Sequence, residues 1–547
     1  MATTVTQSSA RTLVLPLALA QFIASYAASN MNVAITDIAH DLHTSVSGIQ
    51  ATITLFTLTM ASLMIPGSKL TDIVGRKRTF IIGLAIYGAG ALLASVAQNL
   101  PMLIVSYSLL EGIGSALMIP PIYILITVAF SDVATRGKYF GVVSGAAGLG
   151  AATGPLIGGL ITSTISWRAS FVVQFLVVAG IVLMTLRLTD LPLVGRKPRF
   201  DYAGAVLSAA GLFFVVFGVL LTSNYGWGTA RKDLEIGGTV IIPKGGIAPV
   251  WPCIAIGAAF LGLCAWHLHA TEQRGHEPLV SLRLFGNRTS DLGLSTQTVQ
   301  WLVMQGTFFV TSVYLQEVRG YSAIKTGLAL TPATIGVLLA SAVAGRMARR
   351  RAQAVLIRAG FVATVAGMAL LLILVPVSVA VWTLIPGLFL MGAGVGVMLT
   401  ASVNVVQSSF PPDQQGDISG VSRSVSNLGS SLGVALAGSV LVGAAHPGRH
   451  PYALAIAILG VIALLGLLAA LMIPAVKPAS AVPSGAVGRQ PVVADPGAEQ
   501  KVLQRAPRVV ERDPQQPDGE REAEQRPQER AQHVEGAAVP PEHPKAQ

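Results

Sequence analysis

The chain has 547 residues, of which 52% are hydrophobic and only 12% are charged, and its formal net charge is +11. Because soluble domains carry roughly 25% charged residues, this composition excludes an ordinary soluble globular protein. Apolar segments of about 20 residues, long enough to cross a bilayer, recur from residue 13 almost to residue 474. The sequence therefore predicts an all-α polytopic membrane protein.

Taken in chain order, the apolar segments predict fourteen membrane-spanning helices. Short polar loops separate each of them from the next. The predicted spans are approximately 13–35, 49–66, 79–97, 102–127, 138–162, 169–189, 203–222, 248–268, 292–316, 326–345, 354–374, 380–403, 418–443 and 451–474.

Arginine and lysine are distributed unequally between the two sets of loops. One set, together with the N-terminus, carries nineteen basic residues, and the other set carries seven. Because basic loops face the cytoplasm, we expect a cytoplasmic N-terminus at 1–12 and a cytoplasmic tail at 476–547. The tail is rich in Pro, Gln, Glu and Arg, which predicts disorder. A basic face beside anionic membrane lipid accounts for the net charge, so no nucleic-acid partner is expected.

The loop after the second span, "GSKLTDIVGRKRTF", combines a turn glycine with several charged residues. Gly75 permits a tight turn, and Asp72 can accept hydrogen bonds from the N-terminus of a neighbouring helix. Arg76 can pair with an acid of the next loop on the same side, for which Asp132 is the candidate. With Lys77, these residues predict a latch that holds the basic side closed. The alternative is a basic loop that only sets the topology.

The fourth span contains Glu111, within "SLLEGIGSA", as the only acidic side chain deep inside a predicted span. Ionisable residues at such depth are costly and are candidates for a functional site. A buried carboxyl of this kind can gain and lose a proton, or neutralise a bound cation. The structural alternative is an ion pair with another helix, most plausibly with Arg423 in the thirteenth span.

The fifth span contains the glycine-rich stretch "GVVSGAAGLGAATGPLIGG" at 141–159. Gly150, Gly154 and Gly158 recur every four residues and therefore lie on one face of a helix. Small residues at this spacing let two helix backbones approach closely in lipid, and Pro155 adds a bend. The stretch predicts a smooth, kinked helix that can pack tightly and rock. Ordinary close packing in a static bundle is the alternative.

Two of these stretches resemble signature sequences of the major facilitator superfamily. The loop resembles the cytoplasmic signature G-x-L-x-D-R-x-G-R-K, with departures at Ser68 and Ile73. The glycine-rich span matches the antiporter signature of the fifth span at every defined position. The matching residues are Asp72, Gly75, Arg76 and Lys77 in the loop, and Gly141, Gly150, Gly154, Pro155, Gly158 and Gly159 in the span.

The resemblance covers most of 13–475, and fourteen spans are typical of the drug:proton antiporter branch of the superfamily. It implies a six-helix bundle at 13–190, two extra helices with flanking loops at 191–290, and a second six-helix bundle at 291–475. The two bundles would surround a central cavity near the membrane midplane.

The function implied by the resemblance is proton-coupled export of amphipathic or cationic drugs, antibiotics or related toxic metabolites. The protein would be a monomer in the bacterial inner membrane, in contact with lipid, and would exchange protons for its substrate. The sequence has no G-x-x-x-x-G-K-[ST] loop, so the proton gradient rather than ATP hydrolysis is the expected energy source. We expect no enzymatic activity, no cofactor and no metal site.

Two departures from the family pattern leave other functions open. Ala27 stands where the first span of the branch often has an aspartate, and Ser108 replaces the usual arginine of the fourth span. A facilitator or importer of a metabolite on the same fold is therefore one alternative. A membrane sensor or scaffold that transports nothing, with the tail as its interaction arm, is another.

Aromatic and amide side chains in or near the spans are weaker candidates for the wall of a substrate cavity. For any one of them, packing between helices or anchoring at the membrane interface is the competing role. These candidates are Tyr26, Asn30, Tyr107, Tyr123, Gln174, Trp301 and Gln305.

Overall fold

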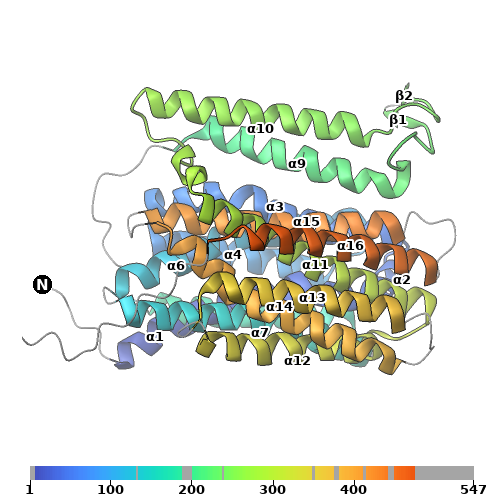
Figure 1. Ribbon diagram of the computed structural model, residues 1–547, viewed down its shortest axis with the longest axis horizontal. Coiled ribbons are helices and arrows are strands. Elements are labelled where there is room, and N and C mark those ends of the chain that lie inside the picture. The colour runs from blue at the N-terminus through green and yellow to red at the C-terminus, as the bar shows by residue number, and fades with distance from the viewer. Residues whose placement is uncertain are drawn as a thin grey trace, which may run out of the picture. The chain divides into compact units, whose positions relative to one another are not determined.

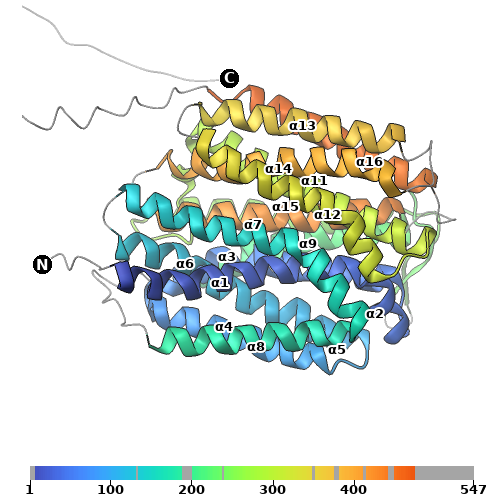
Figure 2. The same ribbon diagram turned by 90° about the horizontal axis from the view of Figure 1, so that it is seen from below.

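The computed structural model describes residues 7–130, 133–187, 200–236, 239–347, 351–374, 381–410, 414–441 and 449–474. In these ranges the long helices run side by side (Figures 1 and 2). The predicted tail at 476–547 lies outside the described residues.

The N-terminal half contains the first six of the predicted spans. Ser45, Asn99 and Ser166 begin α3, α5 and α8 as N-caps, because each side chain accepts a backbone N–H of the first helical turn. The elements are α1 (Gln7–Asn30), η1 (Met31–Val33), α2 (Ile35–Asp41), α3 (Val46–Val74), α4 (Arg76–Ser95), α5 (Leu100–Leu103), η2 (Ile104–Glu111), α6 (Gly112–Ala129), α7 (Val133–Thr164) and α8 (Trp167–Leu186).

The C-terminal half contains the last six predicted spans. Arg358 of α13 donates hydrogen bonds to the carbonyl oxygens of Ala470, Leu471 and Ile473, which satisfies acceptors left open at the C-terminal end of α16. The elements are α11 (Arg288–Val313), η4 (Tyr314–Val318), α12 (Ala323–Met347), α13 (Gln353–Leu374), η5 (Val381–Leu384), α14 (Ile385–Gln407), α15 (Gln415–Leu441) and α16 (Arg449–Leu471).

The two halves pack their helices in the same pattern. In the N-terminal half α1 packs on α7, α3 on α6, and α4 on α8; in the C-terminal half α11 packs on α15, α12 on α14, and α13 on α16. The halves meet along two seams, α3 against α15 and α7 against α12. In this pattern α3 corresponds to α12 and α7 corresponds to α15, so the two seams are equivalent to each other. The space between the halves is therefore lined by corresponding parts of an internal repeat.

Thirteen helical segments of the described residues are long and apolar enough to cross a membrane. The remaining predicted span, the ninth in chain order at 292–316, corresponds to α11, which is not among them. Its hydropathy is lowered by Gln297, Gln300 and Gln305, yet all three side chains are buried. The reason is that α11 packs on α14, α15 and α16 inside the bundle, so its polar side chains face other helices rather than lipid (Figure 2).

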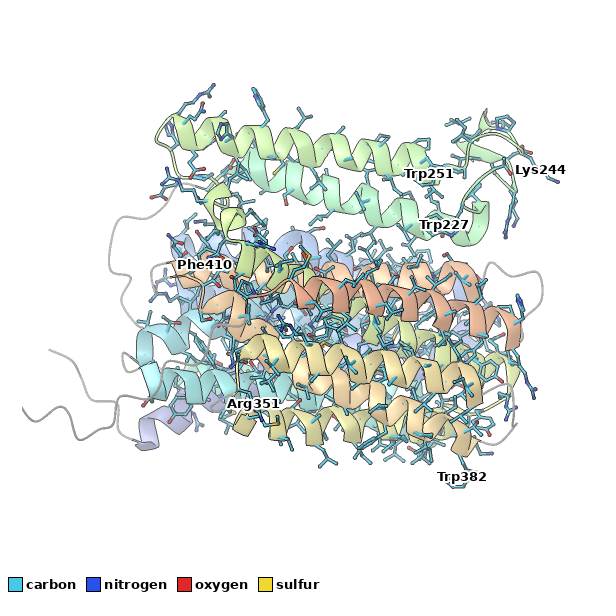
Figure 3. All side chains as sticks on the ribbon, in the orientation of Figure 1. Trp227, Lys244, Trp251, Arg351, Trp382 and Phe410 are labelled. Atoms are coloured by element: carbon cyan, nitrogen blue, oxygen red, sulfur yellow. The ribbon has the colours of Figure 1, made fainter. Side chains whose placement is uncertain are left out.

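The two ends of the bundle differ in their side chains. We call the end where α12 is followed by α13, close to Arg351, the basic end, and the other the opposite end (Figure 3). Trp227, Trp251 and Trp382 lie toward the opposite end and are exposed (Figure 3). Exposed tryptophans near the end of a bundle are typical of the boundary between lipid and water.

Two further helices, α9 (Tyr202–Tyr225) and α10 (Val250–Gln273), pair with each other, and α9 packs on α3 and α15 (Figure 1). Between them lies an antiparallel hairpin of β1 (Leu234–Ile236) and β2 (Thr239–Ile242). The 3-10 helix η3 (Leu282–Gly286) then leads into α11. The second seam is therefore free of this pair, which covers only the α3–α15 side.

Asp201 ties the start of α9 to α10 at the basic end. Its carboxylate accepts hydrogen bonds from the backbone N–H groups of Gly204, at 2.8 Å, and Leu279, at 3.2 Å, and lies 2.9 Å from His267 Nε2. Burial pushes the pKa of Asp201 upward, but these hydrogen bonds and the charge of His267 outweigh it, and the pKa is lowered from 3.8. The stabilisation is therefore present above the unfolded value and is lost as pH falls through the lower, folded value.

Replacing Asp201 with alanine is expected to loosen this end of the α9–α10 pair. Cys264 is buried there and donates to the Gly204 carbonyl, so its thiol reports the opening. In a Cys253→Ser background, maleimide labelling of Cys264 at pH 7 should rise several-fold, since losing bonds to a charged group costs about 1.5–3 kcal/mol. Unchanged labelling would show that Asp201 does not hold the pair together.

Candidate functional site

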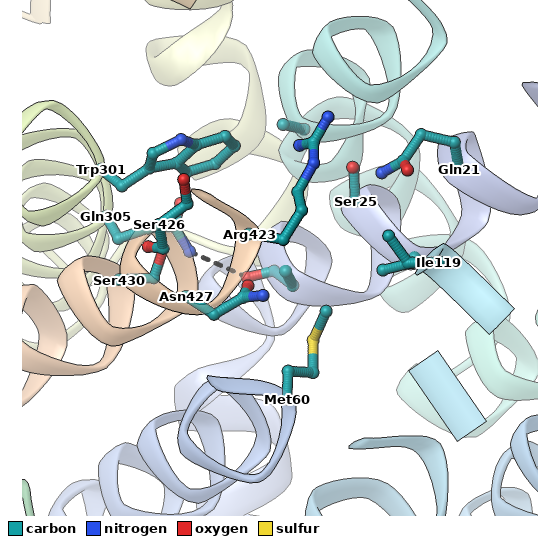
Figure 4. Close-up of a pocket in the computed structure, with 13 residues that line it drawn as sticks. Gln21, Ser25, Met60, Ile119, Trp301, Gln305, Arg423, Ser426, Asn427 and Ser430 are labelled. Atoms are coloured by element: carbon teal, nitrogen blue, oxygen red, sulfur yellow. Dashed lines mark hydrogen bonds between the residues drawn. The ribbon is translucent and has the colours of Figure 1, made fainter. Parts of the chain in front are cut away.

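Two adjoining cavities lie between the halves. The inner cavity, of about 40 Å³, is enclosed by α1, α3, α6 and α7 from one half and by α11 and α15 from the other (Figure 4). The larger cavity, of about 410 Å³, is lined by the first half of α7 and the last parts of α12 and α14, so it lies toward the basic end. Trp301, Arg423 and Ser426 line both cavities, so the two cavities adjoin at these residues.

The walls of the two cavities differ in polarity. Gln21, Ser25, Gln305 and Asn427 face the inner cavity (Figure 4), whereas glycine, alanine, leucine and valine form most of the larger one. The larger cavity is of the size that holds small organic ligands, which bind in mostly apolar pockets with a few polar groups. The arrangement therefore fits an amphipathic small molecule.

Arg423 stands where the cavities meet, in α15. Its guanidinium donates a hydrogen bond to the Tyr123 hydroxyl of α6 and lies 4.8 Å from the centre of the Tyr123 ring. The Tyr123 hydroxyl in turn donates to Gln21 Oε1 of α1 at 3.4 Å. In Figure 4 the Arg423 side chain extends between Trp301 on one side and Gln21 on the other. The cation thus reaches across from the C-terminal half to the N-terminal half.

At the opposite end, hydrogen bonds close the passage between the halves. Gln316 of η4 accepts from the backbone N–H and the hydroxyl of Thr36, at 3.1 and 2.8 Å, and donates to the Asn32 carbonyl at 3.2 Å. The Ile324 N–H of α12 donates to Ser163 Oγ of α7 at 2.9 Å. The cavities are therefore shut off from this end of the bundle.

The seam between α3 and α15 is closed along its length. Gln50 Nε2 donates to the carbonyls of Val434 and Ala435 near the opposite end, at 3.3 and 3.2 Å. Thr57 and Ser431 are hydrogen-bonded at 2.7 Å farther along the same two helices. Since these contacts join the two halves directly, any rocking motion has to shift or break them.

Charged residues join the same two helices at the basic end. Lys69 Nζ of α3 lies 3.0 Å from Asp417 Oδ1 at the start of α15, and both side chains are partly exposed. Asp72 lies in the electrostatic field of Lys69, Arg76 and Asp417. The structure thus places predicted latch residues beside α15, where negative charge near a helix N-terminus is favourable. Asp132, the expected partner of Arg76, lies outside the described residues.

The predicted loop between the second and third spans is largely helical. The helix α3 continues to Val74 rather than ending near residue 66, and at Gly67 it packs closely against the backbone of Ala116 in α6. Only Gly75 leaves helical geometry, with a φ of 112° that favours glycine. Lys77 donates to the carbonyl of Leu186 at 3.3 Å, and so helps to cap α8.

The glycines of α7 face two different helices. Side-chain carbons at Gly150, Gly154 or Gly158 would collide with α1, and one at Gly159 would lie 2.6 Å from the carbonyl oxygen of Ala323 in α12. The carbonyl of Pro155 lies against Gly327 of α12 in the same way. These close approaches are confined to the middle and the opposite-end part of α7.

The first glycine of the signature has a different environment. A side-chain carbon at Gly141 would meet nothing within 4 Å, and the same is true of Gly145. Both residues line the larger cavity. The two ends of α7 therefore differ: one is packed against backbones, and the other borders open space between the halves.

Glu111 is fully buried, but it does not line either cavity. It lies at the end of the π-helical stretch η2, and its side chain faces α4: a side-chain carbon at Gly90 would lie 2.9 Å from Glu111 Cγ. The Tyr87 hydroxyl lies beside it and donates to Gln174 Oε1 of α8 at 2.6 Å. Neither carboxyl oxygen of Glu111 has a hydrogen-bond partner of normal geometry among the described residues.

The expected ion pair between Glu111 and Arg423 is not formed in this structure. Glu111 points away from the cavity toward α4 and α8, whereas Arg423 points into the cavity and bonds Tyr123. Glu111 lies on η2 of the N-terminal half, whereas Arg423 lies on α15 of the C-terminal half. The π-helical turn carries Glu111 behind the cavity wall, a rotation that helical spacing in the sequence does not reveal.

The weaker candidates separate into two groups. Trp301 and Gln305 line the inner cavity, and Tyr123 lies behind Arg423. The other candidates make hydrogen bonds between helices: Tyr26 and Asn30 with Ser170, Tyr107 with the Ala27 carbonyl, and Gln174 with Tyr87.

Sequence reasoning missed Lys69, Asp417 and Ser25. Lys69 was counted only as one more basic loop residue, and nothing in the sequence ties it to a position almost 350 residues later. Asp417 does carry a local signal, since an aspartate in the first turn of a helix is typical of a helix start.

Removing the Lys69 charge is expected to open the basic end more often. A side-chain carbon at Gly420 would lie 3.3 Å from Ser68 Cβ, so a Ser68→Cys/Gly420→Cys pair can form a disulfide when this end is closed. With the native cysteines replaced by serine, Lys69→Gln should slow this cross-link about 2- to 5-fold, as expected for a partly exposed ion pair.

The matched control for this experiment exchanges the charges. The double variant Lys69→Asp/Asp417→Lys restores an attractive pair and should restore the cross-linking rate. If the swap fails while both single variants fold normally, the ion pair does not hold the basic end closed.

Comparison with known proteins gives consistent matches over most of the chain. The family model for the Major Facilitator Superfamily matches residues 17–434 and 381–514. The multidrug resistance protein Stp of Mycobacterium tuberculosis is 27% identical over 411 residues, which cover 75% of this chain and 72% of that protein. The puromycin resistance protein pur8 of Streptomyces alboniger is 30% identical over 418 residues, covering 76% and 78%.

A solved structure agrees in fold. The crystal structure of the human organic anion transporter MFSD10 (TETRAN) superposes with a TM-score of 0.53 and covers 84% of this chain and 99% of that one. The two sequences are only 15% identical, so the match concerns the arrangement of helices alone.

Proposed function

The chain belongs to the major facilitator superfamily, and from this membership we propose that it exports small amphipathic compounds in exchange for protons. The observation that carries the proposal is the adjoining pair of cavities between two matching halves, closed at one end by direct hydrogen bonds. The relatives' names, multidrug resistance and puromycin resistance, support outward movement of toxic compounds.

In the proposed transport cycle, the contacts along the two seams open and close in alternation. With the opposite end closed, a substrate enters the larger cavity from the basic end between α7 and α12 and reaches Trp301 and Arg423. Rocking of the halves then brings the open part of α7, at Gly141 and Gly145, against α12, and separates the packed part. The cavity now faces the opposite end. The glycines of α7 that pack on α1 hold α7 within its own half during this motion, whereas Pro155 and Gly159 lie at the contact with α12 that separates.

The proton is carried by Glu111 in this proposal. No hydrogen bond of normal geometry reaches its buried carboxyl from the described residues, and a neutral carboxyl can donate to the Tyr87 oxygen. Tyr87 gives its own proton to Gln174, so its oxygen remains free to accept. Because Tyr87, Gln174 and Glu111 lie on three different helices, proton release at Glu111 would disturb the packing of the N-terminal half.

The orientation follows from charge. We assign the basic end to the cytoplasm, which places both termini inside and the exposed tryptophans of the opposite end at the outer surface. Relatives from bacteria and the many apolar helices indicate a multi-pass protein of the inner membrane. Substrate and protons then move in opposite directions across that membrane. We further infer that one chain suffices, because both halves of the cavity come from it.

The experiment that tests this function measures retention of a fluorescent amphipathic dye in cells with and without the protein. We expect lower retention in cells that carry the protein, and loss of the difference when a protonophore is added. Import of the dye, or efflux that ignores the protonophore, would contradict proton-coupled export and favour a facilitator. Deletion of residues 480–547 should leave efflux intact, which distinguishes a transporter from a scaffold that acts through its tail.

A further inference from the structure

We propose that the cavity selects substrates with a negative charge attached to an aromatic ring system, and that Arg423 binds the charge. This inference rests on the proposed export function and names the chemical class of the exported compound. It departs from the expectation of cationic drugs, which depended on a carboxylate in the cavity.

The charge of the cavity wall carries the inference. Among the described residues that line the two cavities, Arg423 is the only one with a formal charge. Its contacts are the hydroxyl and the ring face of Tyr123, neither of which neutralises a guanidinium. A guanidinium has five N–H donors, so donors remain for a carboxylate or sulfonate, which it binds in a two-pronged geometry.

The nearby carboxylates are held elsewhere. Glu111 faces α4 behind the cavity wall, and Asp417 is paired with Lys69 at the basic end. Asp72 lies beside that pair, and Asp291, in the first turn of α11, is also near the basic end. A cationic substrate at the cavity junction would therefore meet a like charge without a counter-ion, whereas an anion supplies the missing one.

The shape of the site is the reason for proposing an aromatic ring system in the substrate. The larger cavity has room for a drug-sized molecule, and mostly apolar side chains and glycines of α7, α12 and α14 line it. Trp301 lines both cavities next to Arg423, and so offers a flat ring beside the charge (Figure 4). A ring stacked near Trp301 with its acidic group on Arg423 uses both features at once.

The sign of the substrate charge changes how the membrane potential acts. A singly charged anion leaving as one proton enters moves two charges in the same electrical direction, while a monocation leaving for one proton moves none. At about 100 mV, two charges sustain a concentration ratio on the order of 10³-fold. Export of the anion is therefore expected to depend steeply on the potential.

Two dyes with the same xanthene ring system test the inference. Fluorescein is anionic and rhodamine 123 is cationic, so their difference in transport isolates the effect of charge. The full-length protein is placed in sealed vesicles, with a potassium gradient and valinomycin to set the potential. It should transport fluorescein faster than rhodamine 123. The fluorescein rate should rise when the potential is imposed.

Variants of Arg423 connect the preference to this residue. Arg423→Gln should reduce fluorescein transport about 10- to 100-fold, the loss expected for hydrogen bonds to a charged group. Arg423→Lys should restore part of the rate. Arg423→Glu should reverse the preference toward rhodamine 123, which also demonstrates that the variant folds.

The outcomes separate the inference from the function on which it rests. Wild-type protein that exports rhodamine 123 with proton exchange, but not fluorescein, overturns the anion selectivity and leaves proton-coupled export standing. Equal transport of fluorescein by wild type and Arg423→Gln also overturns it. Transport of neither dye, with no proton movement, contradicts both proposals.

Discussion

Replacing Glu111 with glutamine is expected to abolish accumulation against a gradient while leaving the folded protein intact. Glutamine has nearly the same shape, and its amide can donate to the Tyr87 oxygen as a protonated carboxyl would. It cannot release a proton. With no potential imposed, a pH difference equivalent to about 100 mV, acting on one proton per substrate, sustains a ratio of about 50-fold, and this ratio should fall to about 1 in the variant.

The measurement is dye concentration across sealed vesicles with an imposed proton gradient. Exchange of labelled for unlabelled dye at equal pH needs no net proton movement, so Glu111→Gln should retain it, and this exchange is the control for folding. Glu111→Asp keeps an acid at the site and should retain part of the coupled transport. Undiminished proton-driven accumulation in Glu111→Gln would remove Glu111 from the coupling mechanism.

Valine at Gly154 is expected to have the largest effect on the fold itself. The added side chain would collide with Ser29 of α1 and would lie close to the backbone N–H of Asn30. Because both neighbours belong to a helix that is itself buried, neither can move away freely, and overpacking of this kind costs about 1–3 kcal/mol or more. Folded protein in the membrane should fall severely, together with transport.

A matched control is available in α8. Gly180 has nothing within 4 Å of the position where a side chain would start, so Gly180→Val makes the same chemical change without a collision. Thermal unfolding of the purified variants in detergent compares the two directly. Equal stability of Gly154→Val and Gly180→Val would show that close packing of α7 on α1 does not stabilise this conformation.

The apolar segments of about 20 residues were sufficient to predict the helical membrane fold of this chain. Thirteen of the fourteen predicted spans meet the length and hydropathy requirement in the structure, and α11 follows as a polar helix buried among others. These features depend on local composition. The helix α3 extends to Val74, beyond the approximate predicted end at 66, and its contact with α6 at Gly67 is present only in the folded chain.

The site was less predictable, since it depends on helix rotation and on contacts between distant residues. Glu111 and Arg423 were both identified as charged residues within predicted spans. The direction in which each side chain points, however, depends on the π-helical turn before α6 and on the seam between the halves. The Lys69–Asp417 pair joins segments almost 350 residues apart. The close packing of α7 on another helix, by contrast, follows from glycine spacing, although the identity of that helix, α1, comes only from the structure.

Proton movement coupled to substrate movement is the most direct test of the account. Purified protein is placed in sealed vesicles that contain a pH indicator whose emission wavelength differs from that of the dyes. An outward gradient of fluorescein or rhodamine 123 is then imposed. Downhill movement of the transported dye should drive protons in the opposite direction, and Glu111→Gln should move dye without protons. Dye transport by the wild-type protein with no change in internal pH would contradict the exchange mechanism.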